Sequence, residues 1–249
     1  MNALAVAIRK KTYPNGFCAI QDLRFSVKPG EFVAIVGPSG SGKTTLLNLI
    51  AGLDTHMDGC IDFQVESGPS NHPKIGFMFQ EPRLMPWLTV QQNLELTLPA
   101  ATRVQQTVPL QQWLERVGLP DCAHLFPGQL SGGMQRRVAL LRAFNVKPDV
   151  LLMDEPFQSL DAPTAQQLRI LLHDLCERTR PTVVFVTHSL REALSLADRI
   201  VFLSAGPSRV ILDFPVHLQR PHAVEDPAVQ TLHASLLEQY PQLLSGCIG

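Results

Sequence analysis

Gly37-Pro38-Ser39-Gly40-Ser41-Gly42-Lys43-Thr44-Thr45 is the stretch that decides the fold of this chain of 249 residues. It matches the pattern Gly-x-x-x-x-Gly-Lys-[Ser/Thr], in which a glycine-rich loop joins a strand to a helix. The preceding run 31–36 is apolar and β-branched, which predicts a buried strand. The leucine-rich run 45–53 has helical spacing, so strand, loop and helix follow in the order that a phosphate-binding loop requires.

The residue types explain how this loop would bind phosphate. Gly40 and Gly42 allow backbone conformations that a side chain would hinder, so successive amide groups can point at phosphate oxygens. The helix N-terminus adds the positive end of its dipole. We expect Lys43 to reach the β and γ phosphates of a nucleotide and the Thr44 hydroxyl to bind Mg²⁺.

Composition limits the remaining classes of protein. A chain that is 45% hydrophobic can build one large α/β domain or two small ones, and a formal charge of −1 gives no electrostatic reason to expect nucleic acid. No apolar run approaches 18 residues, so no membrane span is expected. The five cysteines form no C-x-x-C pair, which favours reduced thiols in a cytosolic protein.

Polar residues follow later strands at the points where those strands end. Three apolar runs predict these strands: 74–80, 149–153 and 182–186. The first ends in Gln80, the second leads into Asp154 and Glu155, and the third precedes His188. Ligands of α/β nucleotide-binding proteins lie at the carboxyl ends of strands, which favours function over an ordinary polar cap or a structural histidine. We expect Asp154 to hold Mg²⁺ and Glu155 to orient or deprotonate water.

The segment 81–146 changes character, because prolines interrupt its short helical patterns. It predicts a helical subdomain inserted into the α/β core. Within it, Ser131 is a good N-cap residue, and Gly132 and Gly133 leave the next backbone amides unobstructed. The start of the following helix is therefore either a second anion site or an ordinary capped helix.

Two further features allow more than one interpretation. Tyr13, about two dozen residues before the phosphate loop, is a candidate to stack on a purine. It could equally anchor a hairpin, and Phe17 is a rival platform. The tail 214–249 is too short for a separate domain and carries an amphipathic pattern that we expect to pack on the core: Val229, Leu232, Leu236, Leu237 and Tyr240.

Taken together, these pieces resemble the ATP-binding subunit of ABC transporters over nearly the whole chain. The corresponding motifs are the Walker A loop (37–44), the Q-loop (Gln80), the signature motif (130–135), Walker B (150–155), the D-loop (159–161) and the switch histidine (His188). The resemblance implies one domain, 1–249, with an α/β P-loop NTPase core of the ABC type. It also implies an N-terminal antiparallel β subdomain and the helical insertion.

The resemblance implies ATP and Mg²⁺ as cofactors, and it assigns roles at the site. The implied catalytic residues are Glu155, His188, Lys43 and Gln80. The implied Mg²⁺ ligands are Thr44, Gln80 and Asp154. The implied ATP contacts are Tyr13, Gly37, Pro38, Ser39, Gly40, Ser41, Gly42, Lys43, Thr44, Thr45, Ser131, Gly132, Gly133 and Asp161. The signature residues would complete the ATP site of a second copy packed head to tail.

Within the family, the segment 79–87 and the pair Arg220-Pro221 look most like importers of nitrate, sulfonate, taurine and related small solutes. Met134 in the signature motif and Gln158 before the D-loop depart from the commoner pattern, although neither change removes a chemical group from the site. The implied partners are a second copy, transmembrane permease subunits and a separate solute-binding protein. No nucleic acid is expected. The implied location is peripheral, at the cytoplasmic face of the inner membrane.

The segment 82–87 beside Gln80 is the expected docking surface for the permease, with Met85 and Trp87 as apolar anchors unless they are buried in the helical subdomain.

Two alternative functions remain. A soluble ABC ATPase acting on protein or nucleic-acid assemblies typically has two cassettes or a long coiled coil, whereas only 37 positions separate Lys43 from Gln80 here. An exporter cassette would often be fused to its membrane domain.

Overall fold

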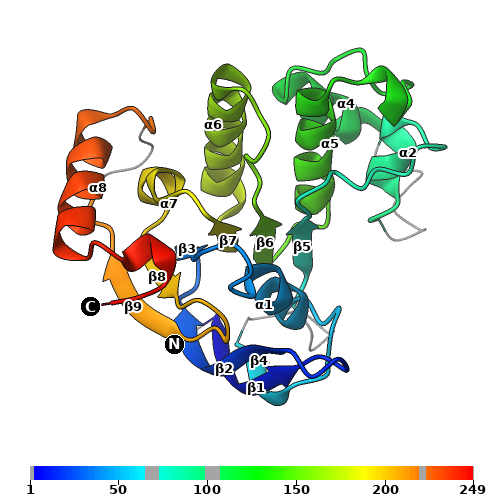
Figure 1. Ribbon diagram of the computed structural model, residues 1–249. Coiled ribbons are helices and arrows are strands. Elements are labelled where there is room, and N and C mark those ends of the chain that lie inside the picture. Colours follow the sequence, from blue (N-terminus) through cyan, green and yellow to red (C-terminus); the bar gives the residue numbers. More distant parts are fainter. Residues whose placement is uncertain (1–2, 65–72, 99–106, 219–222, 249) are drawn as a thin grey trace.

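Two β-sheets enclose helix α1, and this arrangement positions the phosphate loop (Figure 1). The computed structural model describes residues 3–64, 73–98, 107–218 and 223–248. The larger sheet has the strand order β5-β6-β7-β3-β8-β9, in which only β9 runs antiparallel to its neighbour. Its strands are β3 (Phe32–Val36), β5 (Ile75–Met78), β6 (Val150–Asp154), β7 (Thr182–Thr187), β8 (Arg199–Leu203) and β9 (Val210–Pro215).

The central strands of this sheet are buried on both faces, which explains why they are continuous apolar runs in the sequence. Successive side chains of a strand point to opposite faces, and β7 shows the consequence. Val184 and Val186 pack in the hydrophobic cluster that contains α1 (Lys43–Ile50), whereas Val183 and Phe185 pack in the cluster formed with the other helices. The sheet therefore separates two cores.

The smaller sheet closes over the other side of α1. Its strands are β1 (Leu4–Thr12), β2 (Cys18–Val27) and β4 (Asp58–Phe63), in the order β2-β1-β4 with antiparallel pairing. Their inward side chains pack in one cluster with Leu46 and Leu47 of α1, both fully buried. This is the antiparallel N-terminal subdomain that the sequence resemblance predicted.

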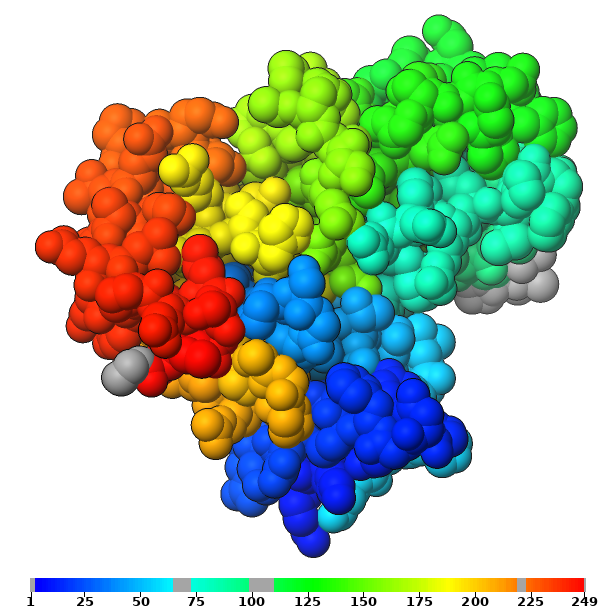
Figure 2. All heavy atoms as spheres, viewed as in Figure 1, coloured from blue at the N-terminus to red at the C-terminus, as the bar shows by residue number. Residues whose placement is uncertain are grey.

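Helices cover the opposite face of the large sheet and form a lobe beyond its β5 edge (Figure 1). The helices of this lobe lie between β5 and β6: α2 (Val90–Glu95), α4 (Thr107–Arg116), the 3₁₀ turn η1 (Pro127–Gln129) and α5 (Gly132–Asn145). In Figure 2 this lobe (green) and the N-terminal strands (blue) occupy different ends of the molecule. Among the described residues, no helix is both long and apolar enough to cross a membrane.

The remaining helices follow the strands of the large sheet. They are α6 (Ala162–Thr179), α7 (Leu190–Leu196), α8 (Pro227–Gln239) and the 3₁₀ turn η2 (Leu243–Ser245). Val229 and Leu236 of α8 are buried in the same core as α7, so the amphipathic tail packs on its own domain as expected. An added Cβ at Gly246 would lie 3.2 Å from Pro38 Cγ, which shows that the end of the tail reaches the phosphate loop.

Candidate active site

The phosphate loop follows β3 and turns directly into α1. Gly40 and Gly42 have φ angles of 77° and 82°, a region that disfavours any side chain. Gly42 is the N-cap residue of α1, and no side chain caps this helix, so its first amides remain available for an anion. An added Cβ at Gly42 would also lie 3.2 Å from the carbonyl oxygen of Ala19. Glycine is therefore favoured at position 42 on two grounds.

Lys43 lies folded over this loop. Its Nζ donates hydrogen bonds of 2.9 Å to the carbonyl oxygens of both Gly37 and Pro38. Burial lowers the pKa of Lys43, and the negative charges of Glu155 and Asp154 oppose that shift. The lysine thus reaches the centre of the loop, where a bound phosphate would replace the two carbonyl groups as its partner.

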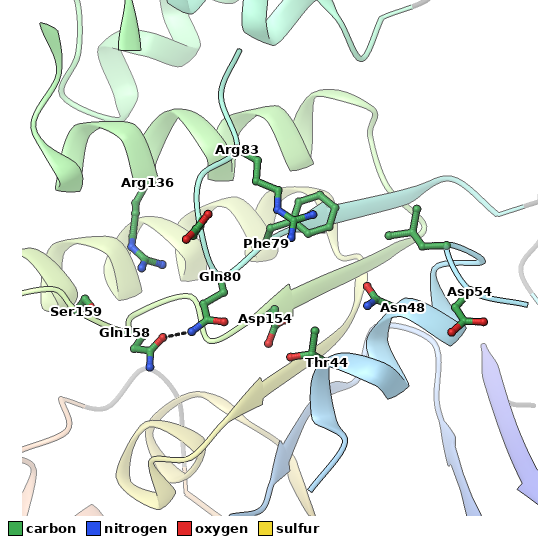
Figure 3. A pocket seen from close by; sticks show the side chains of 12 residues that line it. Thr44, Asn48, Asp54, Phe79, Gln80, Arg83, Arg136, Asp154, Gln158 and Ser159 are labelled. Atoms are coloured by element: carbon green, nitrogen blue, oxygen red, sulfur yellow. Dashed lines mark hydrogen bonds between the residues drawn. The ribbon is translucent and has the colours of Figure 1, made fainter. Parts of the chain in front are cut away.

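Thr44, Gln80 and Asp154 line one cavity of about 610 Å³ at the carboxyl ends of β3, β5 and β6 (Figure 3). Asp154 is buried, and burial raises the pKa of its carboxyl group, although a hydrogen bond with Thr44 opposes the shift. Asp154 Oδ1 is buried and has no hydrogen-bond partner among the described residues. A buried carboxylate oxygen without a partner, beside a hydroxyl and an amide, is the all-oxygen donor set that Mg²⁺ prefers. These residues fit the expected ion.

Glu155 and His188 lie together beside this cavity, at the ends of the neighbouring strands β6 and β7. His188 Nδ1 is 2.8 Å from Glu155 Oε2, and the backbone amide of Glu155 donates to the carbonyl oxygen of Val186 at 3.0 Å. The side chain of Glu155 is 15% exposed and that of His188 is 56% exposed. The largely buried glutamate is thus held beside the cavity by contact with a more exposed histidine.

Arg136 makes contacts beside the cavity that the sequence did not predict, although this residue directly follows the signature motif. This buried side chain of α5 donates to the carbonyl oxygens of Pro156 at 3.1 Å and Glu155 at 3.5 Å. Glu155 has a φ of 44°, which is uncommon for a residue with a side chain. The guanidinium therefore supports a strained turn next to the cavity.

Gln158 also makes a contact that the sequence did not predict. The one signal for it was that a glutamine is uncommon at this position before the D-loop. Its Oε1 accepts a hydrogen bond from Gln80 Nε2, and both side chains line the cavity that contains Asp154 (Figure 3).

The signature residues line a different cavity, also of about 610 Å³. Ser131 caps α5 by accepting a hydrogen bond from the Met134 amide at 3.3 Å. Asp161 caps α6 by accepting one from the Thr164 amide at 3.2 Å, and hydrogen bonds with Thr164 lower the pKa of Asp161. Gly132 and Gly133 line this cavity as well. Within one chain, the structure therefore does not bring the signature residues to the phosphate loop.

The aromatic candidates differ in exposure. The Tyr13 ring is partly buried against the N-terminal core, and its hydroxyl lies 2.8 Å from Thr45 Oγ1. Phe17 is 52% exposed. Purine stacking on either ring stays a prediction.

In the predicted docking segment, Trp87 is 69% exposed, whereas Met85 is half-buried. The pair Arg220-Pro221 lies outside the described residues.

Comparison with known families now adds a decisive observation. A family model described as ABC transporter matches residues 20–158, which span the phosphate loop, Gln80, the signature motif and Asp154-Glu155. The chain belongs to the ABC transporter family. Its predicted family membership is confirmed, and like other ATP-binding proteins of this family it is an ATPase.

Curated relatives agree over nearly the full chain. An aliphatic sulfonates import ATP-binding protein of Burkholderia lata is 40% identical over 96% of this chain and 87% of the relative. The corresponding protein of Bacillus subtilis is 36% identical over 96% of this chain and 94% of the relative. A nitrate import ATP-binding protein of Synechococcus elongatus is 38% identical over 92% of this chain and 88% of the relative.

Solved structures support the fold. A dimeric ATP-binding cassette in a post-hydrolysis state, bound to ADP and Pi, is 32% identical with a TM-score of 0.72, covering 87% of this chain and all of that one. The protein cbiO1 from Clostridium perfringens is 24% identical with a TM-score of 0.73, covering 98% of this chain and 97% of that one. The predicted fold class of the ABC-type P-loop ATPase is confirmed.

Proposed function

We propose that this chain is the ATP-hydrolysing subunit of an importer for small solutes of the sulfonate, nitrate and taurine kind. Relatives that share 36–41% of its residues over most of the chain are named as import ATP-binding proteins for aliphatic sulfonates or nitrate. A soluble ATPase acting on macromolecules and an exporter cassette are not favoured by these relatives.

The observation that supports the mechanism is that Thr44 of the phosphate loop and the signature residues line two separate cavities. One cavity contains Thr44, Gln80 and Asp154, and the other contains Ser131 and Asp161. Each is one half of a nucleotide site, and two chains packed head to tail supply both halves to each ATP. A similar cassette is dimeric with ADP and Pi bound, which supports this arrangement. ATP then binds the closed dimer better than the open one and shifts their equilibrium.

Within each half-site, the phosphate-loop amides and Lys43 bind the β and γ phosphates. Thr44, Gln80 and Asp154 would hold Mg²⁺, which supplies charge neutralisation on the phosphates when bound. Tyr13 stacks on adenine in this proposal. Because Lys43 is already desolvated, its interaction with phosphate charge is stronger than it would be in water.

Glu155 orients the water that attacks the γ phosphate. The contact of His188 with Glu155 keeps that carboxylate beside the cavity and places the imidazole where it can contact the γ phosphate as well. Arg136 holds the backbone on which Glu155 is mounted. Hydrolysis removes the γ phosphate that joins the two halves, and the dimer opens.

The transmembrane pathway belongs to separate permease subunits, which dock on the segment 82–87. The exposed ring of Trp87 is the apolar anchor of this surface. A separate solute-binding protein delivers the solute, and this subunit is peripheral at the cytoplasmic face of the inner membrane.

A pull-down from native membranes tests this function. Tagged Glu155→Gln protein with Mg-ATP should form a stable dimer and recover a polytopic membrane protein, identified by mass spectrometry. The same variant without nucleotide serves as the control, because no ATP is then present to shift the equilibrium toward the closed dimer. Recovery of only soluble factors or nucleic acid by an intact dimer would refute the transport function while leaving the ATPase chemistry. Loss of ATP binding in Glu155→Gln would contradict the role of Glu155.

A further inference from the structure

Gln158 is placed at the edge of the first cavity by the turn that follows β6. Its backbone amide donates to the carbonyl oxygen of Glu155 at 3.2 Å, and Ser159 has a φ of 62°, so the chain reverses direction here. The half-buried side chain of Gln158 extends to Gln80, and its Oε1 accepts a hydrogen bond from Gln80 Nε2. This contact joins the turn after β6 to the segment after β5.

The contact determines which end of the Gln80 amide faces the cavity. An amide group has an oxygen that accepts and a nitrogen that donates, and only the oxygen can bind a cation. In Figure 3 the Gln80 nitrogen faces Gln158, while its oxygen lies on the side of Asp154 and Thr44. Since the terminal torsion of glutamine is broad and roughly two-fold, the side chain itself does not select this orientation.

The charge of Asp154 alone would favour the opposite orientation. Asp154 is an acceptor, and its buried Oδ1 has no hydrogen-bond partner among the described residues. Gln80 lines the same cavity, and a carboxylate attracts the NH₂ end of an amide and repels its oxygen. A donor in that place would compete with a cation. An acceptor on the other side stabilises the observed orientation, and Gln158 Oε1 is that acceptor.

We propose that Gln158 is a positioning residue that orients the Gln80 amide, so that the Gln80 oxygen faces the cation site formed with Asp154 and Thr44. This inference rests on the proposed role of Gln80 as a Mg²⁺ ligand. Gln158 touches neither the nucleotide nor the cation in this role, since it acts through Gln80.

The first test uses the protein without nucleotide or metal. The side-chain NH₂ signals of Gln80 in ¹⁵N-labelled protein can be assigned from their disappearance in Gln80→Glu. Gln158→Met, which matches the length of glutamine but lacks the amide acceptor, should speed solvent exchange of these protons by about 2- to 10-fold, as loss of one hydrogen bond predicts. Gln158→Glu keeps an acceptor and should retain slow exchange. Unchanged exchange in Gln158→Met would overturn the inference.

The second test measures Mn²⁺ binding to ATP-loaded protein by electron paramagnetic resonance in a Glu155→Gln background, which prevents turnover. Gln158→Met should weaken Mn²⁺ binding by about 2- to 10-fold. It should have no further effect when Gln80 is already alanine. The matched control is Gln91→Met, because the Gln91 amide donates to Glu95 on α2 rather than to a group in the cavity.

The outcomes separate the inference from the role on which it rests. Weaker Mn²⁺ binding in Gln80→Ala with unchanged binding in Gln158→Met would refute the inference and leave Gln80 as a ligand. Unchanged binding in Gln80→Ala would refute the ligand role itself, and with it the purpose assigned to Gln158. A further loss from Gln158→Met in the Gln80→Ala background would show that Gln158 acts by another route and would also overturn the proposal.

Discussion

Gly133 lies so close to helix α6 that adding a single methyl group at this position should measurably change the free energy of unfolding. An added Cβ at this position would lie 2.7 Å from Thr164 Cγ2, whereas it would lie 3.9 Å from the Cβ and Oγ1 atoms of the same threonine. Only the threonine methyl group is in conflict with the new side chain. We predict that Gly133→Ala destabilises the protein and that Thr164→Ser, which removes this methyl and keeps the hydroxyl, relieves the conflict.

The expected size follows from two opposing terms. Overpacking costs about 1–3 kcal/mol. Replacing glycine by alanine in a helix stabilises by about 1 kcal/mol. In the wild-type background, Gly133→Ala should therefore lower the free energy of unfolding by about 0–2 kcal/mol. In the Thr164→Ser background only the favourable term remains, so the same substitution should be neutral or stabilising. The coupling energy between the two positions should be about 1–3 kcal/mol.

Urea unfolding of the four proteins without nucleotide measures this coupling, because dimer formation then makes no contribution. Lys147→Ala at an exposed loop position serves as a control that should add independently to either substitution. A coupling energy below about 0.5 kcal/mol, within the usual limit of additivity, would show that α5 and α6 adjust without cost and would refute the reasoning.

Three other predictions follow. Gly76→Ala should lower the free energy of unfolding by about 3 kcal/mol or prevent folding, because its Cβ would lie 2.3 Å from the Ala143 carbonyl oxygen. A backbone group cannot move aside as a side-chain methyl group can. Urea unfolding, or the yield of soluble protein, measures this effect. Asp154→Asn should abolish turnover yet raise the stability of the metal-free protein at pH 7. Burial raises the pKa of Asp154, so the free energy of unfolding of the wild-type protein falls as the pH rises through this raised pKa. The advantage of Asp154→Asn should therefore vanish near pH 4. Urea unfolding of both proteins at pH 7 and at pH 4 checks this. Trp87→Ala should lose permease recovery in the pull-down and keep soluble ATPase activity, unlike the exposed control Ile170→Ala, which should keep both.

The strand ends that form the candidate site were predictable because two features of the sequence mark each of them. A strand buried on both faces must be an apolar run, and a polar residue that follows such a run marks the carboxyl end of the strand. The phosphate loop fixes one strand, so Gln80, Asp154 and His188 could be expected at the same edge of the sheet. The structure brings Gln80 and Asp154 into one cavity and His188 into contact with Glu155 beside it.

The contacts of Gln158 and Arg136 could not be predicted, because they depend on the shape of the turn after β6. Glu155 and Ser159 have φ angles of 44° and 62°, and neither is a glycine or asparagine that would signal a left-handed conformation. A pattern of residue types therefore shows that the chain turns but not where its side chains point. For Tyr13 the sequence allowed two interpretations, and both are compatible with a ring that is half-buried and bonded to Thr45.

Helix α5 connects the features that motif analysis treats separately. Arg142 near its end donates to the carbonyl oxygens of Pro82 and Arg83 at 2.8 and 2.7 Å, while Arg136 near its start holds the turn that carries Glu155. Both arginines are desolvated, which lowers the pKa of each, so losing either set of carbonyl partners would leave a costly unpaired charge. A helix of 14 residues is about 21 Å long, so α5 connects these two sets of contacts directly. If a permease docks on the segment 82–87 as proposed, we expect its displacement of this segment to move the signature end of α5 as well, so that one helix would couple solute transport to completion of the second half-site.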